Sequence, residues 1–357
     1  MRKLNVAIIG QGRSGFSIHG AFFLSGENDK YNVKYVVDYD EYRRQKAERH
    51  FIGCKTLVDY KELFAYDDID LVVNASFSDM HYPITLDLLN HGYNVLVEKP
   101  MGETEYQCRK LIKTAEEKGV TLAVFQQTFF APYYVYAKQT AESGLLGDIQ
   151  QVSVRFNGFS RRWDWQTLQK KCAGGLYNTG PHPVGIALGF LGFDPNTKVV
   201  FSRLGRSLTS GDADDYAKLI LEAPKKPVVD IEVSSCDAFS DYNIKIMGSK
   251  GCLKSTTTKC ELVYIVDGEN PEKPVTEGSL KNDAGDPIYC SESLITHKET
   301  IDFSGTAFDT GSKCMYDEIY DKIVNGKPMS VTADMAAKVI EVIAKVHSEN
   351  PMGIEYL

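Results

Sequence analysis

Short, continuously apolar runs alternate with longer, more polar segments over the first third of the chain. The apolar runs lie at residues 4–9, 33–37, 70–75, 94–97 and 120–125. Strands that are apolar on both faces are typical of a parallel sheet covered by helices on each side. The pattern therefore predicts a doubly wound α/β domain, with helices between the runs at residues 14–25, 40–50, 79–91 and 103–118.

Beyond about residue 130 the pattern changes to longer segments in which apolar and polar residues alternate. Alternation is clear in residues 150–159, 228–239, 241–249 and 260–268. Such strands have one buried and one solvated face, as in an antiparallel sheet. We therefore predict two domains, residues 1–128 and residues 129–357, the second with a mostly antiparallel sheet. Its helices are expected at residues 132–143, 312–325 and 332–348.

Composition and length agree with two ordinary globular domains and exclude several classes of protein. The chain has 357 residues, of which 43% are hydrophobic and 25% charged. Its formal charge of −8 disfavours a nucleic-acid or anionic-membrane binder, because both need a positive surface. No apolar run reaches the roughly 18 residues of a membrane span. The eight scattered cysteines, without a C-x-x-C pair, indicate reduced thiols in a cytoplasmic protein.

A glycine-rich turn, GQGRSG, follows the first apolar run. Gly10, Gly12 and Gly15 form the pattern G-x-G-x-x-G between a predicted strand and a predicted helix. The first glycine permits the tight turn, the second lets the backbone approach a pyrophosphate, and the third lets the helix pack on the strand. Arg13 and Ser14 complete the turn. These five residues are therefore predicted to bind a dinucleotide.

Asp38 ends the second strand, 23 residues after Gly15. At this place a carboxylate meets the ribose hydroxyls of the cofactor, and its charge disfavours the 2′-phosphate of NADP. NAD is therefore the predicted cofactor, with NADP open because Arg43 and Arg44 follow one helical turn later. The alternatives are a helix cap for Asp38 and an exposed helix face for the arginines.

The stretch VLVEKPM, residues 95–101, brings Glu98 and Lys99 to the end of a buried strand. Ligands of open parallel sheets bind beyond the carboxyl ends of the strands, so we expect both residues beside the nicotinamide. The Lys99 ammonium can hydrogen-bond a substrate hydroxyl and stabilise the alkoxide that develops as hydride leaves. Pro100 is expected to fix the turn, for which a cis peptide is one solution. The alternative is a surface ion pair after a strand.

These motifs and several longer stretches resemble the Gfo/Idh/MocA family (glucose–fructose oxidoreductase, inositol dehydrogenase and rhizopine catabolism). VLVEKPM matches its E-K-P signature, NASFSDMHYPITLDLLNHGYNVLVEKP the approach to that signature, and GLLGDIQQV the entry to its second domain. The resemblance implies a Rossmann domain followed by an α/β domain with a large, mostly antiparallel sheet. It implies an NAD(P)-dependent oxidoreductase that interconverts a secondary alcohol and a ketone on a sugar, cyclitol or related polyol.

The same resemblance implies a homodimer or homotetramer formed through the C-terminal sheet. It also places Ser76, His81 and His19 on the cofactor side. Without the resemblance, each histidine would equally be a helix-surface or capping residue.

The stretch GGLYNTGPHPV, residues 174–184, matches the second motif of the family, in which Asp and His lie four residues apart on one helix face. Here His182 holds the histidine position and Asn178 replaces the aspartate. A histidine titrates near neutrality and suits proton exchange with the alcohol, so Lys99, His182 and Asn178 are the predicted catalytic residues. Because Asn178 carries no charge, we expect a lower pKa for His182 than with aspartate there. The alternatives are a structural histidine, and a substrate contact or cap for Asn178.

Weaker substrate candidates flank this motif. Trp163 and Trp165 lie in a stretch rich in arginine and lysine, where aromatic faces can stack on sugar carbons, or simply pack. Tyr177 is a possible donor or a core residue, and Gln126 and Thr128 follow the last Rossmann strand. No metal site is expected, because the histidines and cysteines show no ligand spacing.

Two other functions stay open at this point. Some relatives of the family cleave glycosides by transient NAD-dependent oxidation and elimination, and the uncharged Asn178 and the tryptophan-rich stretch are compatible with that reaction. A non-catalytic ligand sensor on the same fold is the third hypothesis, which the presence of both Lys99 and His182 disfavours.

Overall fold

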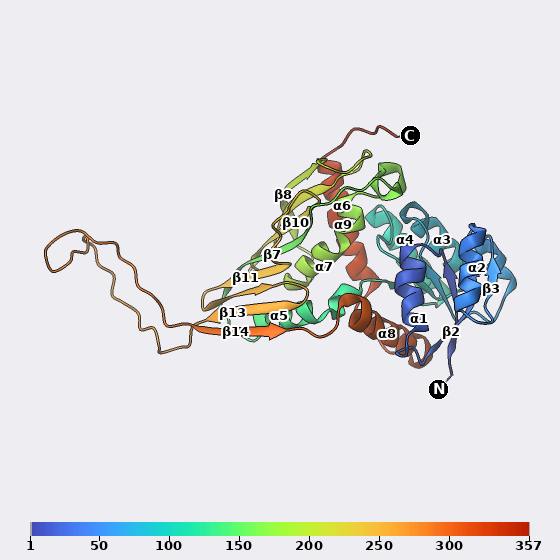
Figure 1. Cartoon of the computed structure of the whole chain (residues 1–357), viewed down its shortest axis with the longest axis horizontal. Coiled ribbons are helices and arrows are strands. Elements are labelled where there is room, and N and C mark those ends of the chain that lie inside the picture. Colours follow the sequence, from blue (N-terminus) through green and yellow to red (C-terminus); the bar gives the residue numbers. More distant parts are fainter. Residues whose placement is uncertain (1, 357) are drawn as a thin grey trace.

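The computed structural model describes residues 2–356, arranged as two α/β units side by side (Figure 1). The N-terminal unit contains a six-stranded sheet of order β3-β2-β1-β4-β5-β6, in which every pairing is parallel. Its strands are β1 (Leu4–Ile9), β2 (Tyr31–Val37), β3 (Lys55–Leu57), β4 (Leu71–Asn74), β5 (Val95–Val97) and β6 (Leu122–Val124).

Helices cover both faces of this sheet, as the continuous apolar runs predict. Along β1, Val6 and Ile8 pack into one buried cluster while Ala7 and Ile9 pack into another, so both faces lie in the core. The covering segments are η1 (Arg13–Gly20), α1 (Ala21–Leu24), α2 (Glu41–His50), η2 (Tyr60–Ala65), α3 (Ser78–Asn90) and α4 (Glu105–Lys118). Among the described residues, no helix combines the length and the apolarity that crossing a bilayer requires.

The second unit is built on an eight-stranded sheet of order β14-β13-β12-β11-β7-β10-β9-β8. Only β7 and β10 pair in parallel, so the sheet is mostly antiparallel, as predicted. Its strands are β7 (Ile149–Asn157), β8 (Lys198–Gly205), β9 (Tyr216–Glu222), β10 (Val228–Ser234), β11 (Ile244–Gly248), β12 (Gly251–Ser255), β13 (Lys259–Tyr264) and β14 (His297–Asp302).

One face of the large sheet packs on helices and the other faces solvent (Figure 1). Alternate side chains of β9 and β10, such as Leu219 and Ile231, are fully buried against these helices. The helices of the unit, with the short η3 that leads into it, are η3 (Gln127–Phe130), α5 (Pro132–Glu142), η4 (Trp165–Thr167), η5 (Gln169–Lys171), α6 (Gly175–Asn178), α7 (Pro181–Phe190), η6 (Ala307–Gly311), α8 (Ser312–Asn325) and α9 (Ala333–Glu349).

The sequence pattern did not predict several of these elements. The strand β3 has only three residues, and the edge strand β8 is largely exposed. Neither therefore shows a regular alternation of buried and exposed side chains. Between β13 and β14, residues 265–296 form a long exposed excursion away from the sheet, drawn in orange in Figure 1. Because its backbone is irregular, no periodic arrangement of apolar residues in the sequence could have predicted it.

The last part of the chain returns to the N-terminal unit through α8. The ring of Tyr316 in α8 stacks on Phe22, with centroids 4.4 Å apart. The hydroxyl of Tyr31 donates to the backbone oxygen of Tyr316 at 2.6 Å. A domain boundary at residue 128 therefore stays a prediction, because α8 completes the core of the N-terminal unit from the far end of the chain.

Candidate active site

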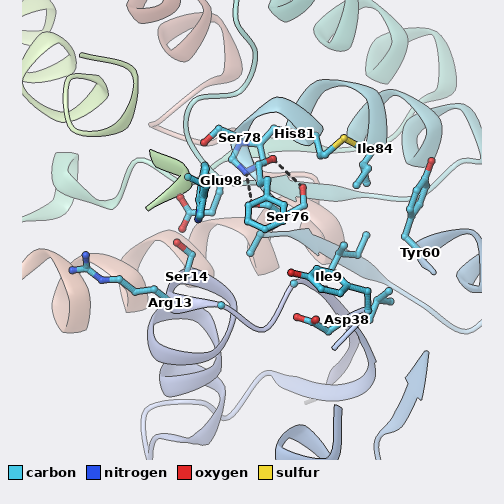
Figure 2. Close-up of a pocket in the computed structure, with 18 of the residues that line it drawn as sticks. Ile9, Arg13, Ser14, Asp38, Tyr60, Ser76, Ser78, His81, Ile84 and Glu98 are labelled. Carbon is cyan, nitrogen blue, oxygen red and sulfur yellow. Dashed lines mark hydrogen bonds between the residues drawn. The ribbon is translucent and has the colours of Figure 1, made fainter. Parts of the chain in front are cut away.

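A cavity of about 560 Å³ lies beyond the carboxyl ends of the parallel strands, where the two units meet (Figure 2). This is the edge at which open α/β sheets bind their ligands. Predicted site residues that line the cavity are Gly10, Gly12, Arg13, Ser14, Asp38, Ser76, His81, Glu98, Lys99, Trp165 and Asn178.

The three glycines of the turn have the three roles that their spacing predicts. Gly10 has a φ of +86°, and a Cβ there would lie 2.4 Å from the backbone oxygen of Ala75. A Cβ on Gly15 would lie 1.8 Å from the backbone oxygen of Gly10, so Gly15 brings helix and strand together and lies outside the cavity lining. Gly12 faces open space within the cavity. The turn therefore leaves backbone accessible where a pyrophosphate would bind.

Asp38 is held at the end of β2 by two backbone donors. Its Oδ2 accepts the N–H of Gln11 at 2.7 Å, and its Oδ1 accepts the N–H of Asp40 at 2.9 Å. The side chain that caps α2 belongs to Asp40, which accepts the N–H of Arg43. Arg43 also lines the cavity, with a guanidinium nitrogen 3.6 Å from Asp38, so it is not simply an exposed helix residue. The choice between NAD and NADP stays a prediction.

Glu98 lines the cavity but is itself almost fully buried. Its Oε1 lies 3.2 Å from Nε2 of His19, whose Nδ1 is hydrogen-bonded to the hydroxyl of Tyr316 at 2.8 Å. Burial alone would raise the pKa of Glu98, but the hydrogen bond and charge of His19, with the charges of Lys99 and His81, lower it to about 2. Glu98 therefore carries a negative charge directly below the catalytic turn.

His81 connects α3 to the E-K-P turn. Its Nδ1 lies 2.8 Å from the backbone oxygen of Pro100 and its Nε2 lies 3.2 Å from that of Ser76. Burial is the main cause of a lowered pKa for His81, and the two backbone oxygens and the charge of Glu98 oppose this lowering. The Lys99–Pro100 bond is cis. His81 thus fixes the turn and the loop after β4 relative to each other (Figure 2).

Lys99 connects the two units. Its Nζ donates to the backbone oxygen of Asn178 at 2.6 Å. Burial lowers the pKa of Lys99, Glu98 opposes this, and the charges of Arg13 and Arg162 add to the lowering. The amine therefore lies at the end of the cavity beside a fixed negative charge and can both donate a hydrogen bond and exchange a proton.

His182 lies at the start of α7, close enough to Lys99 for the lysine charge to affect its pKa. Burial, followed by that charge, lowers the pKa of His182 to about 3. Its Nδ1 is 2.7 Å from Oγ1 of Thr128. His182 is not part of the cavity lining.

Asn178 and His182 do not contact each other as one helix face would suggest. The helix is interrupted between α6, which ends at Asn178, and α7, which begins at Pro181. Pro181 and Pro183 have no N–H to donate to the preceding turn, which explains the interruption. The side-chain amide of Asn178 instead donates to Oε1 of Gln166 at 3.3 Å.

The four weaker substrate candidates separate in space. Trp165 lines the cavity and packs edge-to-face on Phe77, with ring centroids 4.9 Å apart. Trp163 is 78% exposed, while Tyr177 and Gln126 are buried, and all three lie outside the cavity lining. The tertiary positions therefore favour Trp165 among these four predicted contacts, which stay untested.

Sequence reasoning missed other lining residues, including Tyr39, Asp59, Tyr60 and Phe77. The sequence carries a signal only for Tyr39, which follows Asp38 directly, and for Phe77, in the loop after β4. Within residues 2–356 no cluster of three histidine, cysteine, aspartate or glutamate side chains could hold a metal ion. All eight cysteines are free thiols.

Comparison with known proteins gives consistent results for both units. Residues 4–126 match the family described as "Oxidoreductase family, NAD-binding Rossmann fold", and residues 134–254 match the "GFO/IDH/MocA C-terminal domain". The uncharacterised oxidoreductase YhhX of Escherichia coli is 31% identical over 355 residues, covering 96% of this chain and 95% of YhhX.

Two further similarities are more distant. The scyllo-inositol 2-dehydrogenase (NADP⁺) IolW of Bacillus subtilis is 26% identical over 224 residues, covering 62% of this chain and 60% of IolW. The crystal structure of GenD2 from gentamicin A biosynthesis, in complex with NAD, has a TM-score of 0.77 at 22% identity. That alignment covers 100% of this chain and 97% of GenD2, and supports the fold alone.

Proposed function

Because this chain belongs to the GFO/IDH/MocA oxidoreductase family, with an NAD-binding Rossmann domain, we propose that it interconverts a secondary alcohol and a ketone on a sugar, cyclitol or related polyol. The bound dinucleotide supplies or accepts the hydride in this chemistry. One observation carries the proposal: a single cavity runs from the glycine turn to Lys99, and His182 lies within electrostatic reach of that amine.

In the proposed mechanism, Lys99 contacts the reacting hydroxyl. Its ammonium donates a hydrogen bond to the substrate oxygen and stabilises negative charge there as the carbon–hydrogen bond breaks. Glu98, ionised and buried below the turn, favours the protonated amine. The carbonyl of Asn178 orients the same amine from the other unit.

His182 exchanges the hydroxyl proton. Its lowered pKa makes the ring neutral near pH 7, so Nε2 can accept a proton during alcohol oxidation and return it during ketone reduction. Thr128 holds Nδ1 and thereby sets the orientation of the ring. The name of the relative IolW specifies an inositol as its substrate, which supports cyclitols as the first compounds to test.

The test combines cofactor binding with a substrate screen. Thermal shift with NAD and with NADP identifies the cofactor, because a ligand of the native state raises apparent stability. Sugars, sugar acids and cyclitols are then screened by absorbance of the reduced nicotinamide. Lys99→Ala should lower kcat about 10²–10³-fold, the effect of losing a donor to the developing oxyanion.

Lys113→Ala serves as the matched control, because Lys113 is exposed on α4, far from the turn. It should leave kcat unchanged. Equal turnover by Lys99→Ala and wild type would refute the proposed role, and absence of dinucleotide binding would refute the proposed function as a whole.

A further inference from the structure

A short helix of the second unit meets Lys99 and determines where its amine lies. α6 has four residues, and the carbonyl of its last residue, Asn178, accepts the Lys99 hydrogen bond at 2.6 Å. A helix of one turn is not stable through its own hydrogen bonds. The position of the Lys99 amine therefore depends on the groups that hold the first turn of α6.

Asp214, in the loop before β9, holds that first turn. Its backbone oxygen accepts the N–H of Gly175 at 2.6 Å, and its Oδ2 accepts the N–H of Leu176 at 2.7 Å. Gly174 has a φ of +112°, and a Cβ there would lie 2.2 Å from Oδ1 of Asp214. Only glycine fits at residue 174 both in conformation and in space, so the local sequence accommodates this carboxyl group.

The other carboxyl oxygen of Asp214 is buried without an N–H donor. Oδ1 has no hydrogen-bond partner within the described chain, and neither does Nε2 of His347, which lies 3.8 Å away. Buried polar atoms are normally paired, and two facing lone pairs repel each other. At 3.8 Å the two atoms are too far apart for a hydrogen bond, but a proton on Oδ1 removes the repulsion between them. His347 also stacks on Tyr177 of α6, with ring centroids 4.5 Å apart.

The surroundings of this pair favour a neutral carboxyl group. Burial, with the charge of Asp215, raises the pKa of Asp214 to about 7 despite the hydrogen bond from Leu176. Burial lowers the pKa of His347 to about 4. The hydroxyl of Tyr177 donates to the backbone oxygen of residue 103, and its pKa is raised by burial and by nearby groups that include Cys172 and Asp214.

We propose that Asp214 and His347 hold one proton, carried by the buried carboxyl group that faces the imidazole, and act as a positioning pair for Lys99 through α6. The inference rests on the proposed function, in which Lys99 contacts the reacting hydroxyl. Neither Asp214 nor His347 lines the cavity, so both act through the helix. When the pair loses its proton, a buried negative charge remains behind α6 with the N–H of Leu176 as its hydrogen-bond donor, and the Asn178 carbonyl moves relative to Lys99.

Three variants distinguish the protonated from the ionised form of the Asp214–His347 pair. Asp214→Asn reproduces the protonated carboxyl, because its amide can accept from Leu176 and donate to His347. Asp214→Ala removes both contacts, and His347→Leu removes the proton acceptor while keeping an apolar contact with α6. Asp212→Asn is the matched control, since Asp212 is a buried carboxylate of the same loop whose partners are the backbone N–H groups of residues 169, 355 and 356.

The first measurement needs no substrate. Lys99 is labelled with acetic anhydride between pH 6 and pH 9, and its modification rate is followed by mass spectrometry. Asp214→Ala should raise the rate about fivefold, the equivalent of one lost hydrogen bond of about 1 kcal/mol. The wild-type rate divided by the Asp214→Asn rate at the same pH should rise as pH passes through 7, because the titration of the amine itself raises both rates alike. His347→Leu should resemble Asp214→Ala with a smaller effect.

The second measurement separates positioning from general damage. Asp214→Ala should lower kcat about tenfold and leave the thermal shift by dinucleotide unchanged, while Asp214→Asn keeps wild-type kcat at pH 6. Should Asp214→Ala not fold, Asp214→Asn and His347→Leu still decide the matter. Lys99 labelling that is equal in these variants and in Asp212→Asn would overturn the proposal. Altered labelling without turnover of any polyol would refute the proposed function and leave the pair intact.

Discussion

Two buried carboxylates flank the contact between Lys99 and Asn178, one in each unit, and their charges differ. Glu98 in the N-terminal unit has a pKa lowered to about 2, whereas Asp214 in the second unit has a pKa raised to about 7. Burial acts in the same direction on both, because it disfavours the ionised form. The difference arises from their neighbours, since Glu98 is surrounded by His19, Lys99 and His81 while the nearest charge to Asp214 is another carboxylate.

The comparison separates a fixed charge from a titratable one. Glu98 stays ionised at any pH near neutrality and provides a constant field for Lys99. Asp214 changes its charge close to neutral pH and can make the position of α6 depend on pH. The N-terminal unit therefore gives the Lys99 amine a permanent counter-charge, Glu98. The second unit gives it a hydrogen-bond acceptor on α6 whose position depends on the charge of Asp214.

Removal of the fixed charge should have the largest effect on stability. Glu98→Gln leaves the buried His19 and Lys99 without their counter-charge, so the free energy of unfolding should fall by about 3–5 kcal/mol. Urea denaturation of both proteins at pH 7 measures this difference. Glu103→Gln is the control, because the side chain of Glu103 is exposed only five residues away. A loss no greater than that of the control would mean that Glu98 is not a buried, ionised partner.

The pH dependence of stability should have opposite sign for the two carboxylates. The lowered pKa of Glu98 contributes stability that is present above pH 4.5, its unfolded value, and is lost as pH falls toward 2. The raised pKa of Asp214 contributes stability that is present below pH 3.8 and is lost as pH rises through about 7. Each contribution should be on the order of 3–4 kcal/mol.

Urea denaturation between pH 4 and pH 8 tests the Asp214 contribution. Asp214→Asn is compared with its parent in a His347→Gln background, because His347 titrates in the same range. The unfolding free energy of the parent minus that of the variant should fall from pH 4 to pH 7, because the carboxyl group of the parent ionises and the amide of the variant does not. A difference that grows with pH would show that Asp214 is ionised in the folded protein, like Glu98.

The smallest effect should come from introducing a charge at residue 178, where the second unit contacts Lys99. Asn178→Asp places a carboxylate near Lys99 and His182, which favours the imidazolium form of His182. The acidic limb of the kcat/KM profile, set by a pKa of about 3 in the native protein, should move upward by about one unit. Asn178→Ser, without charge, is the control. An unmoved limb in Asn178→Asp would show that residue 178 and His182 are not coupled.

Much of the dinucleotide end of the cavity was predictable from sequence. The glycines at 10, 12 and 15, Asp38 and Lys99 all lie at the ends of apolar runs, and strand ends meet at one edge of a parallel sheet. The opposite end was less predictable. The partner of His182 is Thr128 rather than Asn178, because prolines interrupt the expected helix face. Asp214 had no motif to identify it.

The sequence alone determined the order of the elements, the two kinds of sheet and the place of the glycine turn and of Lys99. These features follow from local periodicity and from motifs within a few adjacent residues, where backbone geometry leaves few alternatives. Only the tertiary structure decided which segments meet Lys99 and which carboxylates are ionised. Charge state depends on burial and on neighbours that are distant in sequence, such as His19 for Glu98 and His347 for Asp214, and no local pattern encodes those contacts.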